Sequence, residues 1–259
     1  MEFGVCGGPD MAEQAVAAGF DYVEMSAPGF LKPLESKETF RKGLSFVTET
    51  RVRCPVVNCF VPGDMKITGP DVDLEALERY AANACANAEE AGVEVIVFGS
   101  GGARRIPDGF DRREAWRQLI AFCQLAGKHA EAHGVTIAIE PLNRAECNVL
   151  NSVAEAGALA RETDHPAIKI LVDAYHWAKD DQSLEAIITS RGLIAHTHIA
   201  TATNRLVPGG EACDFAPFFR ALKQAGYSER MSIEGQIPDP ARDLPRALQL
   251  LRDEWCTAR

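Results

Sequence analysis

Residues 137–146 read IAIEPLNRAE, an apolar run that ends in a carboxylate and is followed at once by proline. The alternation of Val135, Ile137 and Ile139 predicts a buried strand. A carboxylate at the end of such a strand is costly to bury unless it is paired or bound to a metal ion. We therefore expect Glu140 to have a partner elsewhere in the chain.

Similar apolar runs recur along the whole chain and alternate with segments of helical periodicity. They predict eight strands, at residues 3–6, 22–25, 56–60, 94–98, 135–140, 168–173, 194–199 and 231–234. The predicted helices cover residues 11–18, 36–49, 74–91, 112–133, 153–162, 182–190, 215–225 and 241–254. Glycine follows four of these helices, at 19, 92, 134 and 226, where a left-handed residue ends a helix at little cost. The strands start roughly 33 residues apart, a spacing typical of βα units.

Eight βα units predict an α/β fold in which a parallel sheet closes into one (β/α)8 TIM barrel, a single domain over residues 1–259. The length is ordinary for one domain of this kind, and a doubly wound open sheet is the alternative. In a barrel, chemically active side chains gather at the carboxyl ends of the strands.

The composition narrows the possible partners. The chain has 46% hydrophobic residues and a formal net charge of −10, so a phosphate backbone would be repelled and nucleic acid is not an expected partner. With no export signal and no apolar run of about 20 residues, we expect a cytoplasmic protein without a membrane partner. The eight cysteines form no CxxC pair and are expected to be reduced. Cys6 and Cys59, near the ends of predicted strands, are expected to act as small buried hydrophobes, with the lining of a pocket as the alternative.

Four polar residues end four consecutive predicted strands: Glu140, Asp173, His198 and Glu234. Neighbouring strand ends in a closed barrel lie about 5 Å apart, which brings all four side chains within reach of one point. Three carboxylates and one imidazole suit Mn²⁺, Mg²⁺ or Co²⁺ better than a structural Zn²⁺. Taken singly, each residue has an ordinary alternative role as a helix cap, a core histidine or the partner of an arginine.

Several longer motifs make the chain resemble the sugar isomerase and epimerase superfamily of xylose-isomerase-like barrels. Within that superfamily it is most similar to the ketose 3-epimerases of the tagatose and allulose (psicose) type. The motifs are EPLNRAE at 140–146, DHPAIKILVDAYH at 164–176, HTH at 196–198, NRLVPGG at 204–210, FFRALKQAGY at 218–227 and SIE at 232–234.

The resemblance implies an isomerase that epimerises a small ketose or ketose phosphate at C3. Glu140 and Glu234 would form the acid/base pair, one removing the C3 proton and the other reprotonating the opposite face of a metal-stabilised enediolate. Both would also hold the divalent metal ion, Mn²⁺ before Mg²⁺ or Co²⁺, together with Asp173 and His198. The resemblance further implies a homo-oligomer, a dimer or tetramer, and a sugar-binding set of Glu146, His176 and Arg205.

The chain departs from the pattern of these epimerases in two places. After His198 it is one residue longer than the usual HxGExNR and lacks its Glu, and Gly235-Gln236 stands where Pro-Phe is common. The loop GSGGARR, at 99–105, adds a further feature beside the predicted site. It is either a tight glycine turn with solvated arginines or an anion cradle that would suit a phosphorylated or acid sugar.

The remaining candidates have ordinary explanations. Glu24 ends the second strand, and a hydrogen bond to a neighbouring loop accounts for it, so we leave it outside the catalytic set. His129 and His133 lack an HExxH motif and belong to the solvated face of an outer helix. His165 is expected in a loop, and His196 inside the barrel beside the metal histidine.

Other functions fit the same residues. An aldose–ketose isomerase, or a dehydratase acting on a keto-sugar or keto-inositol, needs a similar metal and base. An abasic-site endonuclease shares the architecture but would need more histidine ligands and a less acidic chain. A sugar-sensing module needs no acid/base pair, and so the presence of Glu140 and Glu234 favours an enzyme.

Overall fold

The computed structural model describes residues 1–50, 52–180 and 182–258. Eight parallel strands form a closed barrel in chain order, and β8 pairs with β1. The strands are β1 (Glu2–Cys6), β2 (Tyr22–Ser26), β3 (Val56–Asn58), β4 (Val95–Phe98), β5 (Thr136–Ile139), β6 (Ile168–Asp173), β7 (Ile194–Ile199) and β8 (Arg230–Ile233). The predicted TIM barrel is confirmed, and the open-sheet alternative is wrong.

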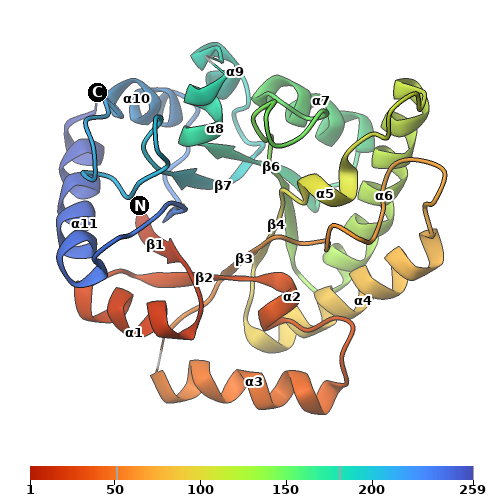
Figure 1. Cartoon of the computed structure of the whole chain (residues 1–259), viewed down its shortest axis with the longest axis horizontal. Coiled ribbons are helices and arrows are strands. Elements are labelled where there is room, and N and C mark those ends of the chain that lie inside the picture. Colours follow the sequence, from red (N-terminus) through yellow and green to blue (C-terminus); the bar gives the residue numbers. More distant parts are fainter. Residues whose placement is uncertain (51, 181, 259) are drawn as a thin grey trace.

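Helices surround the barrel, as Figure 1 shows. The structure contains all eight predicted helices, with ends shifted by a few residues: α1 (Pro9–Ala18), α3 (Lys37–Thr50), α4 (Leu74–Ala91), α6 (Arg112–Ala132), α7 (Val153–Thr163), α9 (Leu184–Ile188), α10 (Ala216–Gln224) and α11 (Pro240–Thr257). The four glycines predicted to end helices have positive φ values between 66° and 86°. Three short helices were not predicted, and each follows a strand closely: α2 (Ala27–Phe30), α5 (Gly101–Arg104) and α8 (Ala174–Lys179).

Apolar side chains form two layers that hold the strand ends in place. Inside the barrel, small and branched residues pack with one aromatic ring: Val56, Val95, Val97, Ala138, Leu171 and Tyr22. A larger layer fills the space between the strands and the helices. Because both faces of each strand are packed, the strand ends provide a rigid base for a site. In the part of the chain that the structure describes, no helix is long and apolar enough to cross a bilayer.

Candidate active site and metal centre

The strand ladder fixes the four predicted strand-end residues at one mouth of the barrel. Glu140 directly follows β5, and its amide still donates to the carbonyl of Phe98 at 3.1 Å. The amide of Glu234, directly after β8, donates to the carbonyl of Ile199 at the same distance. Asp173 ends β6, in register with His198 of β7. Backbone pairing therefore sets where each of these side chains begins.

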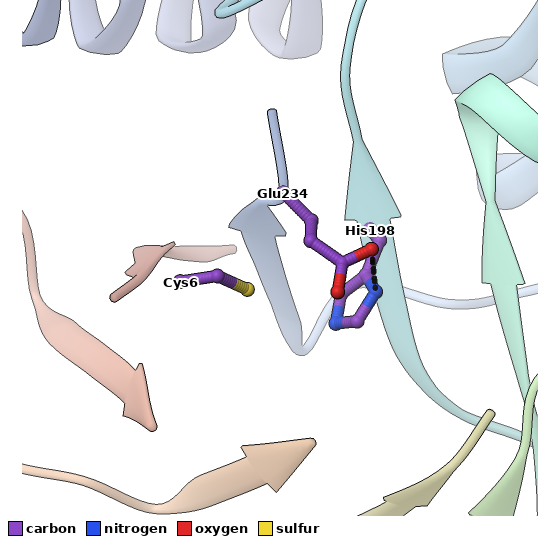
Figure 2. Close-up of side chains that lie close together, drawn as sticks. All are labelled: Cys6, His198 and Glu234. Atoms are coloured by element: carbon purple, nitrogen blue, oxygen red, sulfur yellow. Dashed lines mark ion pairs between the residues drawn. The ribbon is translucent and has the colours of Figure 1, made fainter. Parts of the chain in front are cut away.

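The four side chains meet at Nδ1 of His198. This atom lies 3.1 Å from Oε1 of Glu140, 3.4 Å from Oε2 of Glu234 and 3.9 Å from Oδ2 of Asp173. Figure 2 shows the Glu234 carboxylate turned toward the His198 ring. The structure thus brings together the four residues predicted to hold a metal ion.

Asp173 and His176 each direct one unsatisfied polar atom into this cluster. Asp173 Oδ1 caps α8 by accepting hydrogen bonds from the amides of Tyr175 and His176. Its Oδ2 is buried and, among the described residues, has no hydrogen-bond partner. Nε2 of His176, 4.0 Å away, also has none. Buried polar atoms are rarely left unpaired, so this pair indicates a place for a bound ion or ligand.

Asn143 orients the ring of His176. Its amide and its side-chain Nδ2 donate to Nδ1 of His176 at 3.1 and 2.9 Å. Because Nδ1 is used as an acceptor, the neutral ring carries its proton on Nε2. The unpaired Nε2 is therefore a hydrogen-bond donor directed at the cluster.

Arg205 connects two of the predicted residues across the mouth of the site. It contacts Oε2 of Glu234 at 2.5 Å and Oε1 of Glu146 at 3.4 Å, and its guanidinium lies 4.7 Å from the centre of the Tyr175 ring. Asn143 Nδ2 donates a further hydrogen bond to Glu146 at 2.8 Å. Although the loop before Arg205 is longer than the family pattern, its side chain reaches the site.

Two cavities open beside these residues. The first, about 420 Å³, is lined by five predicted site residues, Glu140, Glu146, His176, Arg205 and Glu234. Asp173 and His198 are almost fully buried and are not among its lining residues. A second cavity of about 690 Å³ is lined in part by Cys6, Glu24 and Asn58. Asn58 Nδ2 donates to Oε1 of Glu234 at 3.4 Å, so the two spaces adjoin at the end of β3.

Two cysteines lie close to the acidic cluster. Cys6 is part of a group with His198 and Glu234 whose metal-binding atoms all lie within 4.8 Å of one another (Figure 2). Cys6 is half-buried and lines the larger cavity, and Cys59 is exposed and lines the smaller one, so the predicted role of both as small buried hydrophobes is wrong. For Cys59 the reason is that β3 ends at Asn58 and Cys59 adopts a φ of 54°, which takes it out of the strand.

The GSGGARR loop lines the smaller cavity with Gly99, Ser100, Gly101 and Gly102, and its predicted role as an anion cradle stays a prediction. Its residues Gly101–Arg104 form α5. Arg104 is fully buried, where it donates to the carbonyls of Phe98 at 3.0 Å and of Glu140 at 2.7 Å. Arg105 donates to the carbonyl of Glu146 at 2.7 Å. Arg104 is therefore not solvated, and both guanidinium groups bind the protein backbone.

Glu24 is the functional candidate that sequence reasoning set aside. It is fully buried, and its two carboxylate oxygens lie 2.8 Å from Nε2 of His198 and 2.8 Å from Nε2 of His196. The expected partner in a neighbouring loop is wrong, because both partners come from β7 on the far side of the barrel. The two histidines, two residues apart on one strand, were the signal that could have identified it.

The electrostatic environment shifts the pKa values of the two glutamates in opposite directions. Burial and the adjacent charge of Glu234 raise the pKa of Glu140. Burial also acts to raise the pKa of Glu234, but the neighbouring His198 and the guanidinium of Arg205 outweigh it and lower that pKa. Two carboxyl groups whose pKa values are driven apart can serve as acid and base.

The donor set fits a divalent cation. Metal-binding atoms of Glu140, Asp173, His176 and Glu234 lie within 4.8 Å of one another, and Nδ1 of His198 contacts three of these residues. His176 belongs to the same group of residues, but its Nε2 carries a proton and is placed to donate to a ligand. The carboxylate oxygen of Asp173 that lacks a partner is the kind of atom that a cation satisfies.

The remaining histidines lie away from this cluster. His133 contacts Glu89 at 2.7 Å and His129 contacts Glu78 at 3.5 Å, which join α6 to α4 on the outside of the barrel. Among the described residues, the groups able to hold a metal ion do not include either histidine. His165 lies in the loop between α7 and β6, as predicted.

Comparison with known proteins agrees with this architecture. The sequence profile of the family described as xylose isomerase-like TIM barrel matches residues 12–254. A solved structure of D-psicose 3-epimerase in the presence of D-fructose superimposes with a TM-score of 0.86, covering 98% of this chain and 99% of that one at 18% identity. At this identity the superposition shows the shared fold alone.

Two curated relatives carry more sequence similarity. The 3-dehydro-D-guloside 4-epimerase of Escherichia coli K12 is 33% identical over 122 residues, 46% of each chain. The L-ribulose 3-epimerase of Methylomonas sp. DH-1 is 26% identical over 250 residues, which cover 93% of this chain and 83% of the relative. The similarity thus spans less than half of the first relative and most of the second.

Proposed function

Because the chain belongs to the xylose isomerase-like TIM barrel family, we propose that it is a metal-dependent epimerase that inverts C3 of a small ketose or ketose phosphate. One observation carries the proposal. Glu140 and Glu234, from strands that are not neighbours, approach the same imidazole nitrogen and line the same cavity. Epimerisation needs a proton acceptor on one face of the sugar and a donor on the other, and this pair supplies both.

The ion-binding residues in this proposal are Glu140, Asp173, His198 and Glu234, with Mn²⁺ preferred to Mg²⁺ or Co²⁺. When bound, a divalent ion supplies positive charge that offsets the negative charge developing on the sugar oxygens. Three carboxylates balance the charge of such an ion, and the guanidinium of Arg205 forms an ion pair with Glu234.

The proton transfers are assigned to the two glutamates from their positions. One of Glu140 and Glu234 accepts the C3 proton, and the other donates a proton to the opposite face of the planar enediolate. The reverse reaction exchanges these roles.

The sugar is oriented by groups at the wall of the cavity. His176 presents its Nε2–H as a hydrogen-bond donor, fixed by Asn143. Arg205 donates to a sugar oxygen beside Glu234, and Glu146 accepts from a hydroxyl. Both residues are partly exposed and able to contact a bound ligand, whereas Asp173 and His198 are not.

A second candidate, epimerisation at C4 of a 3-keto-glycoside, is favoured by one observation. The E. coli relative with 33% identity is named for that activity. The chemistry is the same, because the proton removed is again adjacent to a carbonyl. Only the position of the sugar over Glu140 and Glu234 would differ.

Deuterium exchange tests the proposal. The Mn²⁺-loaded protein is incubated in D₂O with fructose, allulose, tagatose, ribulose, their phosphates and a 3-keto-glucoside, and the sugars are separated from the protein before ¹H NMR. We expect deuterium at C3 of a ketose together with its epimer. Exchange at C4 of the keto-glucoside would select the second candidate, and exchange at C1 would make the protein an isomerase.

Two outcomes would contradict an epimerase altogether. Loss of a β-hydroxyl would show a dehydratase, and absence of exchange across the whole panel would refute the proposal.

A homo-oligomeric state, a single domain over residues 1–259 and a cytoplasmic location stay predictions.

A further inference from the structure

We propose that Glu24 is a positioning residue that fixes the His198 ring so that its Nδ1 lone pair faces Glu140, Asp173 and Glu234. The inference rests on the metal site of the proposed function, and it holds whichever sugar the protein uses. Glu24 does not line the smaller cavity with the predicted acid/base pair, and its carboxylate is already occupied by two histidines.

Each carboxylate oxygen of Glu24 contacts a different imidazole ring. Oε1 lies 2.8 Å from Nε2 of His198, and Oε2 lies 2.8 Å from Nε2 of His196. The two rings are perpendicular, with centroids 5.1 Å apart, and all three side chains are fully buried. Two short hydrogen bonds, both accepted by one carboxylate, therefore hold both rings without help from solvent.

The chemistry of the carboxylate decides which ring nitrogen carries a proton. An ionised carboxylate only accepts hydrogen bonds, so Nε2 of His198 must be the donor. A neutral imidazole that carries its proton on Nε2 has its lone pair on Nδ1. Nδ1 is the atom that lies within 4 Å of all three acidic side chains. A metal-bound histidine usually has such a carboxylate or carbonyl partner on its other nitrogen.

Further hydrogen bonds connect His196 to side chains of neighbouring strands inside the barrel. Nε2 of His196 also lies 3.2 Å from Oγ of Ser232, which lies 2.9 Å from the hydroxyl of Tyr22. Glu24 is thus part of a polar chain through β2, β7 and β8. Ser232 is part of this hydrogen-bond network through its bonds to His196 and Tyr22, but its hydroxyl is not a partner of His198 among the described residues. Ser232→Ala is therefore a matched control.

The test compares Glu24→Gln with Ser232→Ala. The glutamine amide has nearly the same shape, but its NH₂ group can donate to Nε2 of His198 and so favour a proton on Nδ1, the wrong nitrogen for binding a cation. We expect the Mn²⁺ affinity of Glu24→Gln, measured by calorimetry, to fall about 10- to 100-fold. Ser232→Ala should bind Mn²⁺ as tightly as wild type does.

A spectroscopic readout separates positioning from a merely structural role. Histidine ¹⁵N NMR of the wild-type protein with diamagnetic Mg²⁺ should show the His198 proton on Nε2, and that of Glu24→Gln should show it moved or exchanging. A proton on Nδ1 in wild type would overturn the inference even if the variant does not fold. The inference would also be overturned if Glu24→Gln melted at a lower temperature but kept the Mn²⁺ affinity of wild type. Failure of wild type itself to bind Mn²⁺ would instead refute the proposed metal site, and the inference with it.

Discussion

The carboxylate of Glu140 occupies the space that a side chain on Gly99 would need. A Cβ atom built on Gly99 would lie 2.2 Å from Oε2 of Glu140, far closer than two such atoms can approach. We therefore expect Gly99→Ala to displace the carboxylate from the cluster around His198. A displacement of about 1 Å can lower turnover by roughly 100-fold, and overpacking should cost about 1–3 kcal/mol of stability.

Turnover of the sugar identified by exchange, measured at saturating Mn²⁺, checks this expectation. Gly8→Ala is the control, because a Cβ atom there meets nothing within 4 Å and the residue has an ordinary negative φ. Full activity of Gly99→Ala would mean that Glu140 does not need its observed position.

The parts of the molecule that follow from local pattern were predictable. Apolar runs and helix-ending glycines located the strands, and the carboxyl-end rule of barrels then brought Glu140, Asp173, His198 and Glu234 to one mouth. What escaped prediction depends on contacts between residues far apart in the sequence. Glu24 meets histidines 172 and 174 residues away, and Arg104 binds a carbonyl 36 residues away. Pattern within a segment carries no information about such partners.

Arg104 should be important for stability as well as for the site. It is fully buried and donates to the carbonyls of Phe98 and Glu140. Arg104→Met would leave these carbonyls without that donor, and we expect it to lower the free energy of unfolding by about 2–4 kcal/mol. Denaturant titration measures the change. Arg105→Met, on an exposed neighbour with one carbonyl partner, should cost about 1 kcal/mol or less, and an equal loss in both variants would contradict the distinction.

Replacement of the two glutamates should separate catalysis from binding. Glu140→Gln and Glu234→Gln keep the shape of each side chain but remove its ability to exchange a proton at neutral pH. We expect turnover to fall about 10²- to 10⁴-fold with each, while sugar binding at saturating Mn²⁺ changes little. Glu146→Gln, at a residue proposed only to bind sugar, should mainly raise KM. A parallel loss of binding and turnover in the first two variants would argue against their catalytic role.

Cys59 should react slowly with alkylating reagents although it is exposed. Desolvation and the nearby charges of Glu234, Glu140 and Glu24 raise its pKa to about 11. The thiolate is the reactive form, and at pH 8 only about one thiol in a thousand would be ionised at any moment, which slows the reaction in proportion. Alkylation should rise about tenfold for each pH unit up to the pKa. Mass spectrometry with exposed Cys256 as internal reference measures the rates, and a plateau below pH 9 would show that the carboxylates do not act on Cys59.

Asp173→Asn should remove the response to metal without damaging the fold. The carboxylate has two separate tasks, since Oδ1 caps α8 and Oδ2 faces the cluster with no hydrogen-bond partner in the described part of the chain. Asparagine caps helices as well as aspartate does, so the cap should survive. It removes one of three clustered negative charges, and we therefore expect the metal-free variant to be as stable as wild type or slightly more stable, because like-charge repulsion is relieved.

The effect of Mn²⁺ should differ sharply between the two proteins. A ligand at 100 times its dissociation constant stabilises a folded protein by about 2.7 kcal/mol. Wild type should gain that amount and lose it again with a chelator, whereas Asp173→Asn should gain much less at the same concentration. Asp73→Asn is the matched control, because Asp73 caps α4 through its side chain and is not part of any metal-capable group among the described residues. If Mn²⁺ stabilises Asp173→Asn as much as it stabilises the control, Asp173 does not bind the ion.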